Sequence, residues 1–162
     1  MVFTPTTNQV AVGSDTATTF EISVDDGTAA AVLDTVTVVT ATSVNDAPTA
    51  VAITAEAIDE NTDTTAAVTV GTLSTTDADL NDTFTYTFTT TGGGGTDNAS
   101  FAISGATLQV KAGVTLDFET KPSYDVEVTT TDLTGAAYVK ALTVTLNDTN
   151  DAPTNTVPSA QT

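Results

Sequence analysis

The chain has 162 residues, of which 40% are hydrophobic, so it is long enough to bury the core of one full domain. Its 3 Lys+Arg against 21 Asp+Glu give a formal net charge of −18, which excludes nucleic acid and anionic membrane surfaces as partners, because both need a basic protein surface. Cysteine and histidine are absent, so there is no disulfide framework and no donor set typical of zinc. No run approaches the ~20 apolar residues of a membrane span, and we expect no membrane insertion.

Apolar and polar residues alternate with a period of two along most of the chain, and this pattern predicts β-strands. The clearest half-buried strand is expected where Phe84, Tyr86 and Phe88 alternate with threonine. No stretch shows a useful helical period of about 3.6 residues. The predicted strands are centred on residues 20–24, 36–38, 51–53, 68–70, 84–88, 101–103, 108–110, 124–128 and 138–146.

Turn signals that contain glycine separate these strands. Asp25, Asp26 and Gly27 predict an exposed turn after the first strand. The run Gly92–Gly95 has two interpretations, a phosphate-binding loop or a flexible hairpin loop. Because no Lys-Ser/Thr pair and no helical pattern follow the glycines, we favour the flexible hairpin loop.

About seven strands fall between residues 50 and 147, which is the number expected for an immunoglobulin-like β-sandwich of ~100 residues. A repeat brackets this region, because Asn-Asp-Ala-Pro-Thr occurs at residues 45–49 and again at 150–154. Such a recurrence predicts tandem domains joined by short linkers. We predict the C-terminal part of a preceding repeat at residues 1–46, a complete domain at 47–152, and a linker with the first strand of a following repeat at 153–162.

The acidic residues gather in pairs at strand ends and in the linkers. Paired carboxylates can hydrolyse glycosides, but that chemistry needs one acid in an apolar pocket, and no motif here signals one. The sequence has no nucleophile elbow and no nucleotide-binding loop, so we do not expect an enzyme. Carboxylate and amide oxygens in quantity are the ligands that Ca²⁺ prefers, and the pattern therefore predicts calcium binding.

The stretch from Ala47 to Asp151 resembles a cadherin repeat, because five short motifs occur in the family's order. They are Asp59-Glu60-Asn61, Thr76-Asp77-Ala78-Asp79, Leu116-Asp117-Phe118-Glu119, Thr131-Asp132 and Asp148-Thr149-Asn150-Asp151. The resemblance implies an all-β fold, namely an immunoglobulin-like (cadherin-type) antiparallel Greek-key β-sandwich in a tandem repeat.

The resemblance also implies calcium ions at the junctions between consecutive domains. The ligands implied for the upper junction are the Asn45 carbonyl, Asp46, Asp77, Asp79 and Asp132, with the backbone near Asn81. The ligands implied for the lower junction are Glu60, Asp117, Glu119, the Thr149 carbonyl and Asp151, with Asp148 and Asn150 nearby. The chain departs from the family pattern at Ala47 and Ala152, where each linker loses an amide ligand, and at Phe118, where the family has arginine.

The threonine-rich, arginine-free composition and the Val-Asn-Asp-Ala-Pro linker look like the bacterial form of this repeat, found in large secreted RTX-type adhesins. The leading hypothesis is a calcium-binding extracellular adhesion or extender module at the bacterial cell surface. Its partners are then neighbouring repeats or other copies of the chain, together with a glycan or cell-surface partner.

Two alternative functions remain open at the level of sequence. One is a structural subunit of a surface filament or array, in which residues 155–162 of one copy pair with the open sheet of residues 1–45 in another. The other is a carbohydrate-binding accessory module of a secreted polysaccharidase, which predicts an exposed aromatic platform.

Overall fold

The computed structural model describes residues 10–153, and in these residues all regular structure is β apart from one short 3-10 turn. The elements are β1 (Asp15–Val24), β2 (Val32–Thr42), β3 (Ala50–Ile53), β4 (Ala57–Asp59), β5 (Val68–Thr76), β6 (Thr85–Phe88), η1 (Asn98–Ser100), β7 (Phe101–Ser104), β8 (Thr107–Val110), β9 (Ser123–Thr131) and β10 (Ala137–Asn147). The chain divides into two compact units. The first, called the linker unit, takes in residues 1–51, 75–86 and 129–138, and the second, called the core unit, takes in residues 52–74, 87–128 and 139–162.

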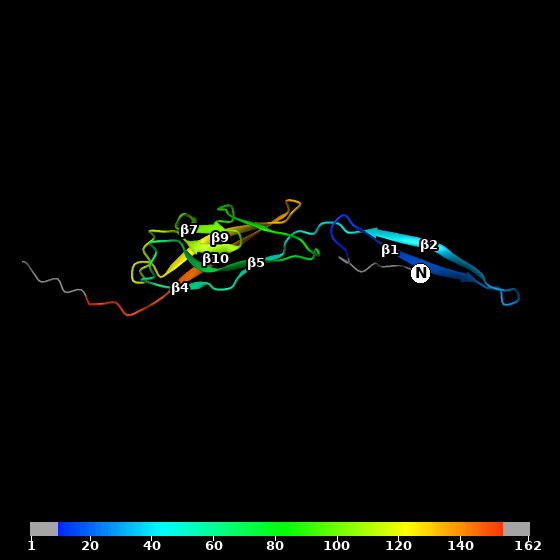
Figure 1. The fold of residues 1–162 in the computed structure, drawn as a ribbon, viewed down its shortest axis with the longest axis horizontal. Coiled ribbons are helices and arrows are strands. Elements are labelled where there is room, and N and C mark those ends of the chain that lie inside the picture. The colour runs from blue at the N-terminus through cyan, green and yellow to red at the C-terminus, as the bar shows by residue number, and fades with distance from the viewer. Residues whose placement is uncertain (1–9, 154–162) are drawn as a thin grey trace, which may run out of the picture. The chain divides into compact units, whose positions relative to one another are not determined.

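Strands β1 and β2 form a two-stranded antiparallel sheet in the linker unit (Figure 1). The turn between them is exposed, as predicted. Within it, the Asp25 and Asp26 side chains accept hydrogen bonds from the backbone of the residues that follow. The Asp25 Oδ1 atom accepts from the Gly27 N–H at 2.7 Å, and Asp26 Oδ1 accepts from the Thr28 N–H at 2.9 Å. These short contacts hold the pair in a tight local turn.

The remaining strands form two four-stranded sheets with the orders β4-β10-β9-β6 and β3-β5-β8-β7. Strand β8 pairs antiparallel with both β5 and β7, whereas β4 runs parallel to β10. Consecutive strands alternate between the two sheets from β3 to β7, whereas β7 and β8 share one sheet and β9 and β10 share the other. The predicted all-β, cadherin-type Greek-key sandwich is confirmed.

The core consists of the inward residues of the alternating strands, which explains why the period-two pattern was a reliable guide. Val126 and Val128 on β9 and Leu108 on β8 are completely buried. The Phe101 and Tyr124 rings add an edge-to-face contact with centroids 5.7 Å apart. The predicted half-buried strand at residues 84–88 is also confirmed, as β6.

Two features differ from the sequence-based expectation. Strand β4 was not predicted, since its three residues are too few to show a period. The Gly92–Gly95 run was predicted to be a flexible hairpin loop, and this was wrong, because β6 and β7 lie in different sheets. The buried Glu127 fixes the run: its Oε1 accepts from the Gly92 N–H and its Oε2 from the Gly94 N–H, both at 2.9 Å.

The predicted domain boundaries at residues 46/47 and 152/153 stay a prediction. The predicted first strand of a following repeat lies outside the described residues, except for Pro153.

Candidate cation sites at the two linkers

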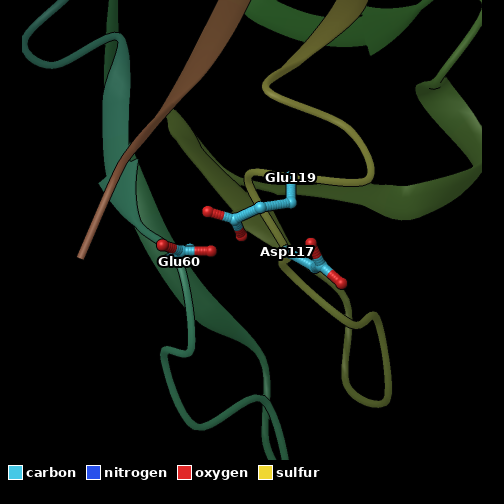
Figure 2. Close-up of side chains that lie close together, drawn as sticks. All are labelled: Glu60, Asp117 and Glu119. Atoms are coloured by element: carbon cyan, nitrogen blue, oxygen red, sulfur yellow. The ribbon is translucent and has the colours of Figure 1, made fainter. Parts of the chain in front are cut away.

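Three acidic side chains of the core unit converge beside the second linker, and we call them the Glu60 cluster: Glu60, Asp117 and Glu119. One carboxylate oxygen from each lies within 4.8 Å of the others. Figure 2 shows Glu119 extending from its loop toward Glu60. All three were predicted as ligands from the motifs.

Glu60 is the best fixed of these side chains, with 3% of its surface exposed. It follows β4, whose parallel pairing with β10 places residue 59 opposite Asn147, directly before the linker. The Glu60 Oε2 atom accepts from the Phe118 N–H at 2.7 Å, and Oε1 accepts from the Thr149 N–H at 2.8 Å. Glu60 therefore joins the loop that carries the other two acids to the linker itself.

Further carboxylates of the linker surround Glu119. An interaction with its own backbone N–H lowers the pKa of Glu119, but desolvation and the negative charges of Glu60, Asp151 and Asp148 outweigh it and raise the pKa above its ordinary value. Asp151 is also held by Asn61, whose Nδ2 donates to Asp151 Oδ1 at 2.8 Å. Within residues 10–153 the only ion pair joins Lys121 to Asp97, so no lysine pairs with these carboxylates and negative charge accumulates here.

A second group lies in the linker unit, and we call it the Asp132 cluster: Asp77, Asp82 and Asp132. One carboxylate oxygen from each again lies within 4.8 Å of the others. Asp132 is positioned by the turn between β9 and β10, where its Oδ1 accepts from the N–H groups of Gly135 at 2.7 Å and Ala136 at 2.9 Å. The hydrogen bond from the Asn45 side chain, followed by those from this turn, holds the pKa of Asp132 below its ordinary value.

The first linker is tied to this cluster by two hydrogen bonds. The Asn45 Nδ2 atom donates to Asp132 Oδ2 at 3.0 Å, and the Asp46 N–H donates to Asp79 Oδ2 at 2.7 Å. The Asp79 N–H in turn donates to Asp77 Oδ1 at 2.9 Å. These contacts bring all five predicted upper residues together with the linker.

Four buried side-chain oxygens, in the Asp132 cluster and in the residues Asn45 and Asp79 beside it, have no hydrogen-bond partner. They are Asn45 Oδ1, Asp77 Oδ2, Asp79 Oδ1 and Asp82 Oδ2. A buried carboxylate oxygen without a donor is costly, and such groups are rare unless water or an ion satisfies them. The donor set consists of hard oxygens, which fits calcium and does not fit softer transition metals.

The structure places the predicted residues in two groups, and their roles as ligands stay a prediction. Thr149 meets Glu60 through its N–H, and its carbonyl role remains untested. Asn150 is exposed, and its Nδ2 donates to the Asp151 carbonyl at 3.1 Å, as Asn45 Nδ2 does to the Asp46 carbonyl at 2.9 Å; its role as a ligand stays a prediction. Sequence reasoning missed Asp82, although its position three residues after Asp79 was the available signal.

No protein-family model and no curated protein matches this chain. Among solved structures it is similar to the PcdhgB3 EC1-4 fragment, with a TM-score of 0.54 and 19% identity over 83% of this chain. It is also similar to extracellular cadherin domains 3-6 of protocadherin gamma B2, with a TM-score of 0.51 and 17% identity over 83% of this chain. The chain spans 32% of the length of each of these structures. The likeness shows a cadherin-like fold.

Proposed function

We propose that this chain is a calcium-binding extracellular module in which calcium stiffens the linkers of a cell-surface adhesion protein. One observation carries the proposal: buried, unpartnered oxygens occur in the same unit as the linker residues Asn45 and Asp46, and one of them belongs to Asn45 itself. An ion bound by these oxygens holds the linker to the loop of Asp77 and to the turn of Asp132.

The mechanism is electrostatic. Without a cation, the carboxylates of each cluster repel one another, and the linker unit contains no lysine or arginine to offset them. Calcium reverses the sign of the interaction and takes roughly 6–8 oxygens, more than any single segment here supplies. Asp77, Asp79, Asp132 and Asn45 would hold an ion at the first linker, and Glu60, Asp117, Glu119 and Asp151 at the second.

The extracellular setting is part of the proposal. It is supported by the cadherin-like fold and by the name of the protocadherin gamma B2 structure, whose domains are extracellular. In residues 10–153 no helix is long and apolar enough to cross a membrane. We propose a bacterial RTX-type adhesin as the parent protein, on the resemblance of its linker sequence, and no catalytic role.

Backbone NMR relaxation of the full chain tests the stiffening. With calcium, the heteronuclear NOE of the Asn45 and Asp46 amides rises to that of the strands, and with chelator it falls. The exposed Gly27 turn is the internal control, since no cluster contacts it, and its NOE stays unchanged. Linker amides with the same NOE in calcium and in chelator would contradict the proposal.

A second candidate function, assembly with another copy of the chain, has one observation in its favour. The β1–β2 sheet leaves large apolar side chains exposed, namely Ile22, Val24, Val32, Leu33, Val38 and Val39. Among the described residues, β1 and β2 pair only with each other, and strand addition by another copy would extend this two-stranded sheet.

Sedimentation velocity over a range of concentrations tests this candidate. Assembly predicts association that Val24→Ser with Leu33→Ser weakens and that Leu133→Ser, also exposed but outside the β1–β2 sheet, leaves unchanged. A monomer at every concentration contradicts it. The carbohydrate-binding alternative gains no support, because no aromatic side chain in residues 10–153 is exposed.

A further inference from the structure

Asp82 lies close to Asp77 and Asp132, which are both predicted to bind calcium, although none of the five motifs contains Asp82. It lies between β5 and β6, after Asn81, whose φ of 62° turns the chain. One of its carboxylate oxygens lies within 4.8 Å of oxygens from Asp77 and Asp132. Two oxygens bound to the same calcium ion are separated by up to about 5 Å, so this spacing is compatible with a shared ion.

The two oxygens of Asp82 are in different situations. Oδ1 accepts from the Thr83 N–H at 2.7 Å, and Oδ2 is buried without a hydrogen-bond partner. Asp79 provides a second, independent sign of a missing ligand, because the residue is 8% exposed and its Oδ1 is buried without a partner. Asp77 Oδ2 and Asn45 Oδ1 are in the same condition.

All four unpartnered atoms are acceptors, so only a donor or a cation can satisfy them. Two water molecules have enough hydrogen-bond donors for the four atoms, but water does not offset the negative charges of Asp77, Asp79 and Asp82. None of the three lysines, Lys111, Lys121 and Lys140, donates a hydrogen bond to these four atoms. A multivalent cation satisfies the four oxygens and also offsets their charge, which water does not do.

We propose that Asp82 is a direct ligand of the calcium ion at the first linker, and that its extra negative charge raises the affinity of this site. The inference rests on the proposed calcium function and extends it to a residue outside the cadherin-like motifs. Asp82 offers Oδ2 to the ion, while the Thr83 N–H fixes Oδ1 and thereby the orientation of the carboxylate.

Calorimetric titration of the calcium-free full chain with CaCl₂ tests the assignment. Asp82→Asn keeps the size and the hydrogen bond from the backbone but removes the charge. The matched control is Asp63→Asn, since Asp63 is exposed and likewise accepts one nearby N–H, from Thr65 at 2.9 Å, outside both clusters. Asp79→Asn serves as the reference for a residue already assigned to the site.

The expected result is that Asp82→Asn weakens one class of calcium sites by about tenfold or more, or removes one ion from the stoichiometry, as Asp79→Asn does. Asp63→Asn binds like the wild type. If Asp82→Asn also binds like the wild type while Asp79→Asn is weakened, the Asp82 assignment is overturned and the calcium function stands. If the wild type takes up no calcium, both are overturned.

Unfolding in chelator separates a ligand from a structural residue. Removing a buried, unpaired charge leaves the calcium-free chain as stable as the wild type or more stable. An Asp82→Asn chain that is less stable than Asp63→Asn in chelator, or that does not fold, overturns the assignment.

Discussion

Two buried glutamates use their carboxylates differently. The Glu60 carboxylate lies beside other acidic side chains at the second linker. The Glu127 carboxylate accepts hydrogen bonds from backbone N–H groups of the Gly92–Gly95 run and thereby fixes this run. A Cβ on Gly92 would lie 2.6 Å from Glu127 Oε2, so a larger residue at this position would displace the carboxylate. The Glu127 carboxylate is therefore a structural group.

Glu127→Gln is expected to destabilise the fold by about 2 kcal/mol, because one backbone N–H loses its acceptor and meets a buried amide donor instead. Urea unfolding in calcium measures the free energy of unfolding. Glu56→Gln is the matched control, since Glu56 is exposed. Equal losses in the two variants would show that the Glu127 contacts do not stabilise the loop.

The ion pair of Asp97 and Lys121 contributes to the stability of the folded chain in a way that depends on pH. Desolvation raises the pKa of Asp97, but the hydrogen bond and charge of Lys121 and the Asp125 N–H outweigh it and hold the pKa below its ordinary value of 3.8. Because the pKa of Asp97 is lowered in the folded state, the ion pair stabilises the fold fully above pH 3.8. This stabilisation is lost as the pH falls through the folded-state pKa.

Asp97→Asn is therefore expected to cost about 1 kcal/mol at neutral pH, since Lys121 is partly exposed, and to cost less in acid. Urea unfolding of both chains at neutral pH and at a pH well below 3.8 checks this. The same difference at both values would mean that the ion pair is not its source.

Within the secondary structure, the same kind of strand is found in two environments. Strands β2 and β10 each have 11 residues and each precede a linker with the Asn-Asp-Ala-Pro sequence. Leu142, Val144 and Leu146 on β10 are buried, whereas Val38 and Val39 on β2 are exposed. A two-stranded sheet with exposed apolar residues is marginally stable by itself.

Hydrogen exchange is expected to separate the two strands. Amides of β1 and β2 exchange at least about tenfold faster than those of β9 and β10, because local opening of the hairpin exposes little buried surface. Mass spectrometry of the monomeric chain at low concentration, followed peptide by peptide, measures this. Equal protection of β2 and β10 would mean that another part of the chain or another copy covers the hairpin.

Alternation predicted the longer strands because their inward residues are valine, leucine and aromatic residues at every second position, as on β9. It could not reveal β4, which is fixed by its parallel pairing with β10. The loop at Gly92 was also out of reach, because its anchor, Glu127, lies 35 residues away. Local pattern predicts elements, while contacts distant in sequence decide how a short strand or a loop is held.

At the scale of the whole molecule, six of the 21 acidic residues form the two clusters, and each cluster is hydrogen-bonded to linker residues. The motifs located most members of both clusters, because each motif lies at a strand end that the fold brings to the linker. They missed Asp82, whose role depends on where the turn after Asn81 directs its side chain. The motifs therefore named most of the acidic residues that the fold brings together, and the roles of these residues as ligands stay a prediction.

Thermal unfolding of the full chain in CaCl₂, in MgCl₂ and in chelator at equal ionic strength tests the central claim most directly. At a free calcium concentration about 100 times the Kd, one site adds about 2.7 kcal/mol. The account predicts that calcium raises Tm by about 5–10 °C for each site, and that magnesium does so less, because it needs a smaller octahedral site. The same Tm in calcium and in chelator would contradict the account.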